Sequence, residues 1–157
     1  MSLNERRPVG RRIGSADPPA GTLCDHGVMT RSVIDRWHAF LDGGHDPAVL
    51  DELLADDVVF CSPAVFTPQE GKAKTVMYLN AAAKVFTDTD FHYVGEWFGD
   101  RSAVLEFAAT VDGRYVNGVD MITWNDDERI ASFKVMIRPF KGLQVVIGKM
   151  AELLQPT

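Results

Sequence analysis

The chain has 157 residues, of which 46% are hydrophobic and 24% charged, a composition typical of one globular domain whose core needs no disulfide. Its formal net charge of -6 argues against nucleic acid and against an anionic membrane surface as the main partner. No apolar run is long enough to span a bilayer, and the two cysteines, Cys24 and Cys61, form neither a disulfide framework nor a metal-ligand motif, so we expect a cytoplasmic protein.

Residues 1–29 are rich in proline and glycine and show almost no apolar periodicity. Such a segment cannot bury enough surface to offset the entropy of ordering it, so we predict a flexible tail followed by one domain over residues 30–157. Two explanations of the tail stay open: translation that starts at Met29, and a cloning remnant in the first three residues.

Three helices are predicted in the first half of the domain. The first follows Thr30 as N-cap and ends at Gly43-Gly44, and the second opens with Asp46 as N-cap and Pro47 at its first position. The third covers residues 71–86. Between the second and third helices, residues 57–66 are predicted to form a strand broken at Pro63.

Strands follow in succession after the third helix. Tight turns at 99–100, 112–113 and 125–127 separate strands predicted at 91–98, 102–111, 114–124 and 129–138, and a last helix covers 142–154. Helices followed by hairpin-linked strands indicate an α+β fold in which helices cover one face of a mostly antiparallel sheet. A hollow between the two layers is where a small molecule would bind.

Asp120 is the one acid in an otherwise apolar strand, 118-GVDMITW-124. Alternation places it on the same face as Val116, Gly118, Ile122 and Trp124. A buried, unpaired carboxylate is costly, so Asp120 is either a structural acid that pairs with an arginine or backbone N–H groups, or a pocket acid with a raised pKa. A slip of one residue in the strand register would reverse the assignment of faces.

Three segments resemble the nuclear-transport-factor-2-like superfamily, and within it the SnoaL-like proteins. They are 33-VIDRWHAFLDGGHDPAVLDELLADDVVFCSP-63, 71-GKAKTVMYL-79 and the hairpin around Asp120. The resemblance implies a cone-shaped roll of three helices against a strongly bent, mostly antiparallel sheet with a C-terminal helix, and a homodimer formed through the sheet. Relatives include ketosteroid isomerases, polyketide cyclases, epoxide hydrolases and binding proteins without activity, so the fold alone does not fix the function.

The ketosteroid isomerase pattern is kept in part. Asp120 falls on the carboxylic acid that is kept neutral in the oxyanion hole of that enzyme. Trp37 falls on a helix-1 tyrosine and Ser62 on the aspartate base, and a serine cannot replace that base unaided. The epoxide hydrolase pattern requires an aspartate where this chain has Val135. The polyketide cyclase pattern asks only for an acid–base residue in an apolar, cofactor-free pocket.

Two residues are therefore candidate catalytic groups: Asp120, and His38 as a proton carrier near physiological pH, for which a packing role at the helix edge is the alternative. Glu106 is expected on the outer face, at a dimer contact. Trp37 and Tyr78 are expected to donate hydrogen bonds to a ligand. The expected pocket lining is Trp37, Phe60, Ser62, Tyr78, Phe107, Trp124, Phe133 and Val135.

The sequence favours a protein that binds a small hydrophobic molecule with Asp120 as its polar anchor. The alternative is a cofactor-free isomerase, cyclase or hydratase-type enzyme that uses Asp120 as acid or base, and whether the protein is an enzyme is left open. A filled core without a pocket is a third reading. No metal, no cofactor, no nucleic acid and no membrane partner is expected.

Overall fold

The computed structural model describes the backbone of residues 26–155 and the side chains of residues 32–155. Most of the predicted 1–29 tail lies outside the described residues. The described part holds four helices: α1 (His26–Asp42), α2 (Pro47–Leu53), α3 (Lys72–Phe86) and α4 (Phe140–Leu153). It also holds six strands: β1 (Leu54–Cys61), β2 (Gln69–Glu70), β3 (His92–Gly99), β4 (Ser102–Val111), β5 (Arg114–Trp124) and β6 (Ile130–Arg138).

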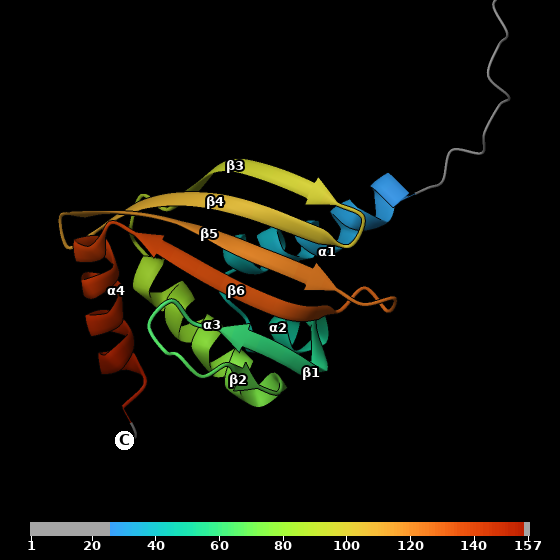
Figure 1. The fold of residues 1–157 in the computed structure, drawn as a ribbon, viewed down its shortest axis with the longest axis horizontal. Helices are drawn as coiled ribbons and strands as arrows, with labels where there is room; N and C mark the ends of the chain where they lie inside the picture. The colour runs from blue at the N-terminus through green and yellow to red at the C-terminus, as the bar shows by residue number, and fades with distance from the viewer. Residues whose placement is uncertain (1–25, 156–157) are drawn as a thin grey trace, which may run out of the picture.

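The six strands form one sheet in the order β2-β1-β6-β5-β4-β3. All neighbours pair antiparallel except β1 and β6, which are parallel. Helices α1, α2 and α3 lie against one face of the sheet, and none of the described helices covers the other face (Figure 1). The predicted α+β architecture with a mostly antiparallel, curled sheet is confirmed.

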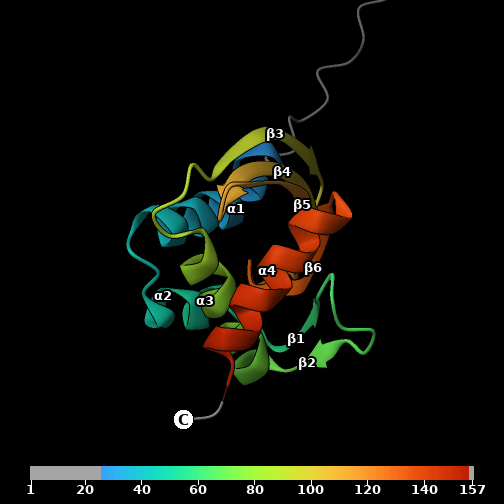
Figure 2. The same ribbon diagram turned by 90° about the vertical axis from the view of Figure 1, so that its left-hand side faces the viewer.

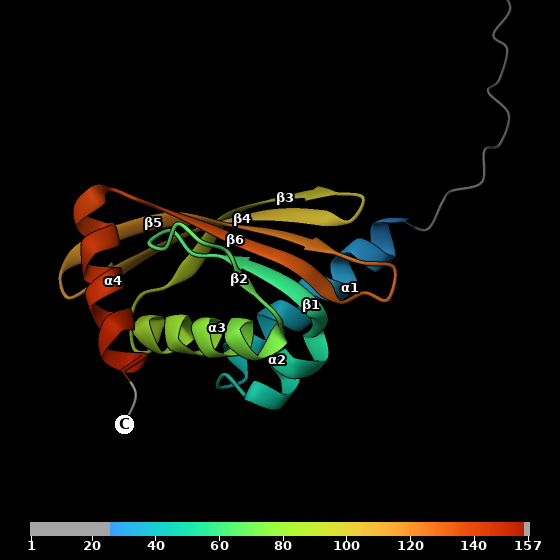
Figure 3. The same cartoon turned by 60° about the horizontal axis from the view of Figure 1, so that its bottom comes forward.

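Helix α4 closes one end of this two-layer arrangement. Figure 2 shows it crossing in front of the open end between the sheet and α3, and Figure 3 shows it standing between the sheet and the end of α3. It contacts β5 and β6 on one side and α3 on the other. Val146 on α4 is buried, so the helix adds to the core as well as capping it.

The end of α1 and the start of α2 follow the sequence signals, whereas α4 runs from Phe140 to Leu153 in place of the predicted 142–154. Asp46 accepts a hydrogen bond from the backbone N–H of Ala48, as an N-cap should, and α1 stops directly before Gly43. However, α1 starts at His26, not after Thr30. The sequence contains no proline between residues 20 and 46, so nothing in that region stops a helix from extending past a possible cap.

The strand limits depart from prediction at β1. This strand begins at Leu54, directly after α2, whereas the predicted strand starts at residue 57. Leu53, Leu54 and Ala55 are all buried, and a continuous apolar run does not distinguish a helix end from a buried strand. The strand ends at Cys61, before Pro63, and the short partner β2 was not predicted.

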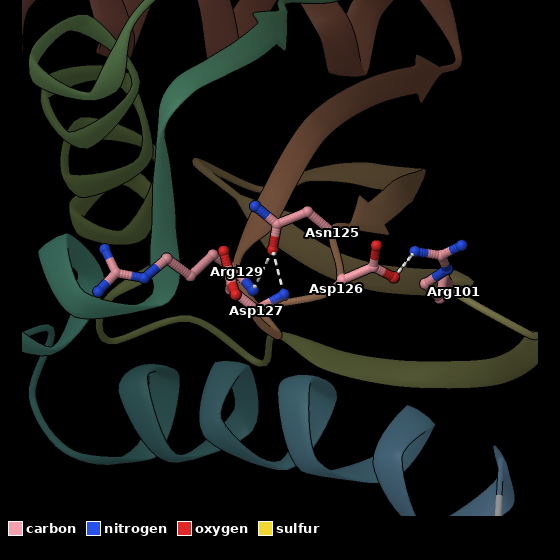
Figure 4. Close-up of polar contacts among 5 residues, drawn as sticks. All are labelled: Arg101, Asn125, Asp126, Asp127 and Arg129. Carbon is pink, nitrogen blue, oxygen red and sulfur yellow. Dashed lines mark hydrogen bonds and ion pairs between the residues drawn. The ribbon is translucent and has the colours of Figure 1, made fainter.

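The turn between β5 and β6 is fixed by polar contacts. The Asn125 side chain accepts hydrogen bonds from the backbone N–H groups of Asp127 and Arg129, and Arg101 pairs with Asp126 (Figure 4). Glu128 has a positive φ of 56°. This turn sets the register in which β5 presents Asp120 to the interior.

The face predicted for Asp120 is confirmed. Val116, Gly118, Asp120, Ile122 and Trp124 are buried, whereas Tyr115, Met121 and Thr123 on the other face are exposed. The core consists of two apolar clusters, one under α1 and α2 and one beside α4. Tyr93 and Val135 pack against both clusters, so they lie where the two meet.

Candidate functional site

A cavity of about 720 Å³ opens between the sheet and the helices. Its wall is mostly apolar and aromatic, with contributions from α1, α3, α4 and the inner face of the sheet. The size lies within the range of small-molecule sites. The third reading of the sequence, a filled core without a pocket, does not describe this fold.

Asp120 is a buried acid of this cavity. It lines the wall and is only 6% exposed. The Tyr93 hydroxyl donates a hydrogen bond to its Oδ2 over 2.8 Å. Its second oxygen, Oδ1, has no hydrogen-bond partner among the described residues. The sequence left open a structural acid that pairs with an arginine or with backbone N–H groups. Among the described residues, Asp120 instead pairs with the Tyr93 hydroxyl.

The direction of this hydrogen-bond chain is fixed by Trp37. An indole N–H only donates, and Trp37 Nε1 lies 2.8 Å from the Tyr93 hydroxyl oxygen. Tyr93 therefore accepts a hydrogen bond from Trp37 and donates one to Asp120. Neither Trp37 nor Tyr93 keeps a proton for a ligand, so a ligand at this end of the cavity meets the carboxyl group of Asp120.

Burial sets the protonation of the pair. It raises the pKa of Asp120 from the ordinary value of 3.8 to about 7, and the hydrogen bond from Tyr93 opposes part of that rise. Burial, and then the nearby charge of Asp120, raise the pKa of Tyr93 well above its usual range, so the phenol keeps its proton. Near neutral pH, Asp120 is present both as an acid that donates from Oδ1 and as a carboxylate that accepts there.

A β-bulge brings Tyr93 to this position. The register of β3 on β4 shifts between Tyr93 and Gly95, so Tyr93 and Glu96 both face the helices although they are three residues apart. Glu96 Oε1 lies 2.8 Å from Nε2 of His38 on α1. Strict alternation would place residues 93 and 96 on opposite faces, and for this reason the sequence reasoning missed both.

Nearly all the residues expected in the pocket lie on one cavity. Its wall includes Trp37, His38, Phe60, Ser62, Tyr78, Phe107, Asp120, Phe133 and Val135. Trp124 is not among them: it is buried in the core beneath α1 and α2, away from the cavity. The expectation that Trp37 donates to a ligand is also not met, because Tyr93 occupies its only donor.

Two other side chains of the wall carry polar groups. Tyr78 stacks on Phe60 with 5.4 Å between ring centroids, and its hydroxyl has no partner among the described residues. Ser62 accepts a hydrogen bond from the backbone N–H of Ala64, which gives it a local turn role. Glu106 faces away from the cavity, where it accepts from Asn117.

The family of the chain follows from a match over the region that holds this site. The profile of the SnoaL-like domain matches residues 34–133, which is more than half of the chain. This chain belongs to the SnoaL-like domain family. The matched region begins in α1 and ends at Phe133, and so contains Trp37, His38, Tyr93 and Asp120. No curated protein matches the sequence.

Solved structures with the same fold include one at substantial sequence identity. A steroid delta-isomerase from Pseudomonas aeruginosa is 36% identical, with a TM-score of 0.74 over 80% of this chain and 91% of that one. An uncharacterised protein with a cystatin-like fold from Silicibacter pomeroyi is 28% identical, with a TM-score of 0.70 over 76% of this chain and 83% of that one.

A third similar structure is SalBIII, described as an epoxide hydrolase/cyclase-like enzyme in pyran ring formation in polyether salinomycin. It is 18% identical, with a TM-score of 0.58 over 73% of this SnoaL-like chain and 93% of that chain. At this identity the likeness shows the fold alone.

Two absences among the described residues bear on other kinds of function. No helix there is long and apolar enough to cross a membrane, and the cytoplasmic location stays a prediction. No group of three or more histidine, cysteine, aspartate or glutamate side chains in the same region is arranged to hold a metal ion.

Proposed function

We propose that this SnoaL-like protein binds a small hydrophobic molecule that carries a carbonyl or hydroxyl group, with Asp120 as its anchor. The observation that carries the proposal is a buried acid in an apolar cavity of about 720 Å³, with an Oδ1 that is unpartnered among the described residues. Oδ1 of Asp120 is not a sealed-off atom, since Asn80 Oδ1 is the one fully buried side-chain polar atom without a partner among the described residues, so a ligand oxygen in the cavity can form a hydrogen bond with it. The aromatic wall favours a flat or polycyclic skeleton.

The anchor selects ligands by protonation state. The neutral acid donates from Oδ1 and suits a carbonyl oxygen, whereas the carboxylate accepts and suits a phenol or alcohol. Trp37 fixes the direction of the hydrogen-bond chain through Tyr93 to Asp120. Oδ1 of Asp120 therefore offers a ligand either one donor or one acceptor at a time. The Tyr78 hydroxyl provides a second polar contact elsewhere on the wall.

A thermal-shift screen tests this proposal. The panel contains enones, phenols, steroids and terpenoids; steroids are included because of the Pseudomonas aeruginosa relative. A ligand present at about 100 times its dissociation constant adds roughly 2.7 kcal/mol to the free energy of unfolding. We expect hits with the wild type that are lost in Asp120→Leu, which has no polar group, and kept in Tyr78→Phe or weakened slightly. Hits that bind equally to Asp120→Leu would exclude Asp120 as the anchor.

A second candidate function is a cofactor-free enzyme of the isomerase, cyclase or hydratase type, with Asp120 as acid or base. The observation that favours it is the pKa of Asp120, about 7, since a proton-transfer group works best near the operating pH. Incubation of each hit with the protein separates the two functions. Chemical conversion of the bound molecule supports the enzyme, and recovery of the unchanged molecule supports the binding protein.

We also propose that the face of the sheet opposite the helices binds a second copy of the chain. Trp97, Tyr115, Met121 and Met136 lie there with a third or more of their surface exposed. An exposed apolar face of this kind is typical of a protein–protein contact. The resemblance to dimeric relatives favours a second copy of the chain as the partner. Sedimentation of the wild type as a dimer and of Met136→Glu as a monomer would support the proposal, whereas a monomeric wild type would contradict it.

A further inference from the structure

His38 lies on the cavity wall next to the Trp37–Tyr93–Asp120 hydrogen-bond chain and forms no hydrogen bond with its members. It follows Trp37 on α1, and its ring meets the ring of Tyr93 edge-on with 5.2 Å between centroids. Its Nε2 lies 2.8 Å from Oε1 of Glu96. Tyr93 therefore contacts His38 through its ring and Asp120 through its hydroxyl.

Glu96 reaches His38 because of the bulge in β3. The cross-strand register pairs Glu96 with Leu105 and Leu105 with Asp120, so the two acids stand in one row, two strands apart, on the inner face. One acid supports the histidine, and the other lines the cavity.

The contact with Glu96 determines which nitrogen of His38 is available. A carboxylate only accepts, so Nε2 carries the hydrogen and the neutral ring keeps its lone pair on Nδ1. Nδ1 has no hydrogen-bond partner among the described residues. This is the arrangement in which a carboxylate orients an imidazole for proton transfer.

We propose that His38 is the catalytic base of this cavity and that Glu96 is its positioning residue. The inference rests on the proposed function, in which a ligand carbonyl is held at Asp120. Ser62 cannot fill this role, because a serine hydroxyl is not a base near neutral pH and its oxygen already accepts from Ala64.

The reaction assigned to the site is proton transfer at carbon. His38 Nδ1 takes a proton from a carbon next to the carbonyl, the C–H electron pair forms a C=C bond, and the carbonyl π pair moves onto the oxygen. Asp120 stabilises that oxygen through its Oδ1–H. Return of the proton from His38 to the same carbon, or to the far end of a conjugated system, restores the ring and needs no oxidant or further reactant.

The test uses 5-nitrobenzisoxazole, a carbon acid that reports on a positioned base by forming a coloured nitrophenolate. The base removes the C3 proton, the C–H pair completes a C≡N bond, and the N–O bond breaks to leave the phenolate oxygen. We expect the wild type to react with saturation and to exceed free 4-methylimidazole at equal concentration. We expect His38→Gln to lose about a hundredfold or more of kcat, as for removal of a general base.

Matched controls are present on the same wall. His45 and His92 also line the cavity, but neither forms an ion pair among the described residues, so His45→Gln and His92→Gln should change KM at most and show none of the hundredfold loss of kcat expected for His38→Gln. The side chain introduced by His38→Gln can still donate a hydrogen bond to Glu96, so we expect the variant to fold. Circular dichroism checks that it does. The other titratable groups on the wall are Asp42, Tyr78, Asp88, Tyr93 and Asp120.

The positioning role of Glu96 has its own readout. Glu96→Gln should lower kcat and leave KM in place, because without the carboxylate nothing fixes which ring nitrogen of His38 carries the hydrogen. A purely structural role would change stability but leave the kcat of the folded variant in place, and would overturn the assignment of Glu96. The assignment of His38 would be overturned if the wild type reacted no faster than free 4-methylimidazole. It would also be overturned if His38→Gln reacted at the wild-type rate.

Failure of this inference is distinguishable from failure of the proposed function. If 5-nitrobenzisoxazole and the panel hits bind through Asp120 while His38→Gln keeps its rate, the anchor stands and the base assignment is wrong. If His38→Gln is inactive while binding is the same in Asp120→Leu, the base stands and the anchor is wrong.

Discussion

The Tyr93 hydroxyl donates a hydrogen bond of 2.8 Å to Asp120, although the two residues lie 27 positions apart and on strands separated by β4. This contact joins the two apolar clusters of the core to a buried acid of the cavity. Because Trp37 donates to the same hydroxyl, the contact has one direction. The chemistry available to a ligand at this end of the cavity is that of the Asp120 carboxyl group.

The first prediction concerns stability and pH. Burial raises the pKa of Asp120 from 3.8 to about 7 in the folded chain. Between these two values the unfolded chain releases the proton and the folded chain keeps it, so this group lowers the free energy of unfolding as pH rises through that window. The loss is complete above about pH 7 and is on the order of a few kcal/mol.

Urea unfolding of the wild type and Asp120→Asn at pH 5 and pH 8 measures this effect. From pH 5 to pH 8 the free energy of unfolding should fall less in the variant than in the wild type, because the variant has no carboxyl group at position 120. Asp56 and Asp90, whose pKa values are lowered by hydrogen bonds, contribute the opposite slope at lower pH, and both remain in the variant. Equal pH dependence in the two proteins would show that Asp120 titrates normally.

The second prediction concerns Tyr93→Phe. Loss of the hydroxyl leaves the Trp37 N–H and the Asp120 Oδ2 without their partner, at a cost of about 1–3 kcal/mol. It also removes the hydrogen bond that lowers the pKa of Asp120, so the pH at which carbonyl ligands lose affinity should rise. Tyr78→Phe is the matched control, since its hydroxyl has no partner among the described residues.

Unfolding by urea and ligand titration at several pH values measure both effects of Tyr93→Phe. An unchanged midpoint in the pH dependence of ligand binding would mean that the hydrogen bond from Tyr93 does not tune Asp120. Equal stability losses in the two phenylalanine variants would mean that the chain of hydrogen bonds adds nothing to the fold.

The third prediction concerns the space beside the cavity. A Cβ at Gly118 would clash with Cζ of Phe107 and would lie 2.6 Å from the carbonyl oxygen of Met136. Gly118→Ala should therefore push the ring of Phe107 toward the cavity and destabilise the protein by roughly 1–3 kcal/mol. Gly148→Ala is the control, because its Cβ meets open space on α4 and should add about 0.5–1 kcal/mol.

Thermal unfolding of the two alanine variants compares these effects. A Gly118→Ala variant as stable as Gly148→Ala would show that the strand shifts away from Phe107 at little cost. Ligand affinity of the folded Gly118→Ala variant reports on whether Phe107 has entered the cavity.

The fourth prediction concerns the β5–β6 turn. Glu128 adopts the left-handed region with a φ of 56°, which costs a non-glycine residue about 1 kcal/mol. Glu128→Gly should stabilise the protein by up to that amount, since its backbone contacts to Asn125 and Arg36 do not need the side chain. Gly113→Ala, at a φ of 72°, should destabilise it; the reverse order of melting temperatures would contradict the argument.

The sequence was sufficient for the order of elements and for the face of Asp120. The Asp46-Pro47 cap, the Gly43-Gly44 stop and the hairpin turns are local signals that tertiary structure did not override. The limits of α1 and β1 were predicted less well, because a cap signal at Thr30 and an apolar run at Leu53 to Ala55 each allow two assignments.

The site could be predicted only in part. Asp120, Trp37 and His38 are visible as unusual residues on apolar faces, but the residues that connect them are not. Tyr93 and Glu96 face the cavity together only because of a bulge, and a bulge leaves no periodic signal in the sequence. Trp124 obeys the alternation of β5 and is buried, yet lies beyond the cavity, because alternation gives the face and not the depth.

The affinity of a carbonyl ligand, the best enone or ketone from the screen, at pH 6 and pH 8 tests the role of Asp120 most directly. Titration calorimetry on the wild type should show affinity falling about tenfold between these values, as the neutral acid is lost around pH 7. Asp120→Asn, whose amide donates as the neutral acid does, should bind without this pH dependence, and Asp120→Leu, which has no donor, should bind more weakly at pH 6. Equal affinity of the wild type and Asp120→Leu at pH 6 would contradict the account.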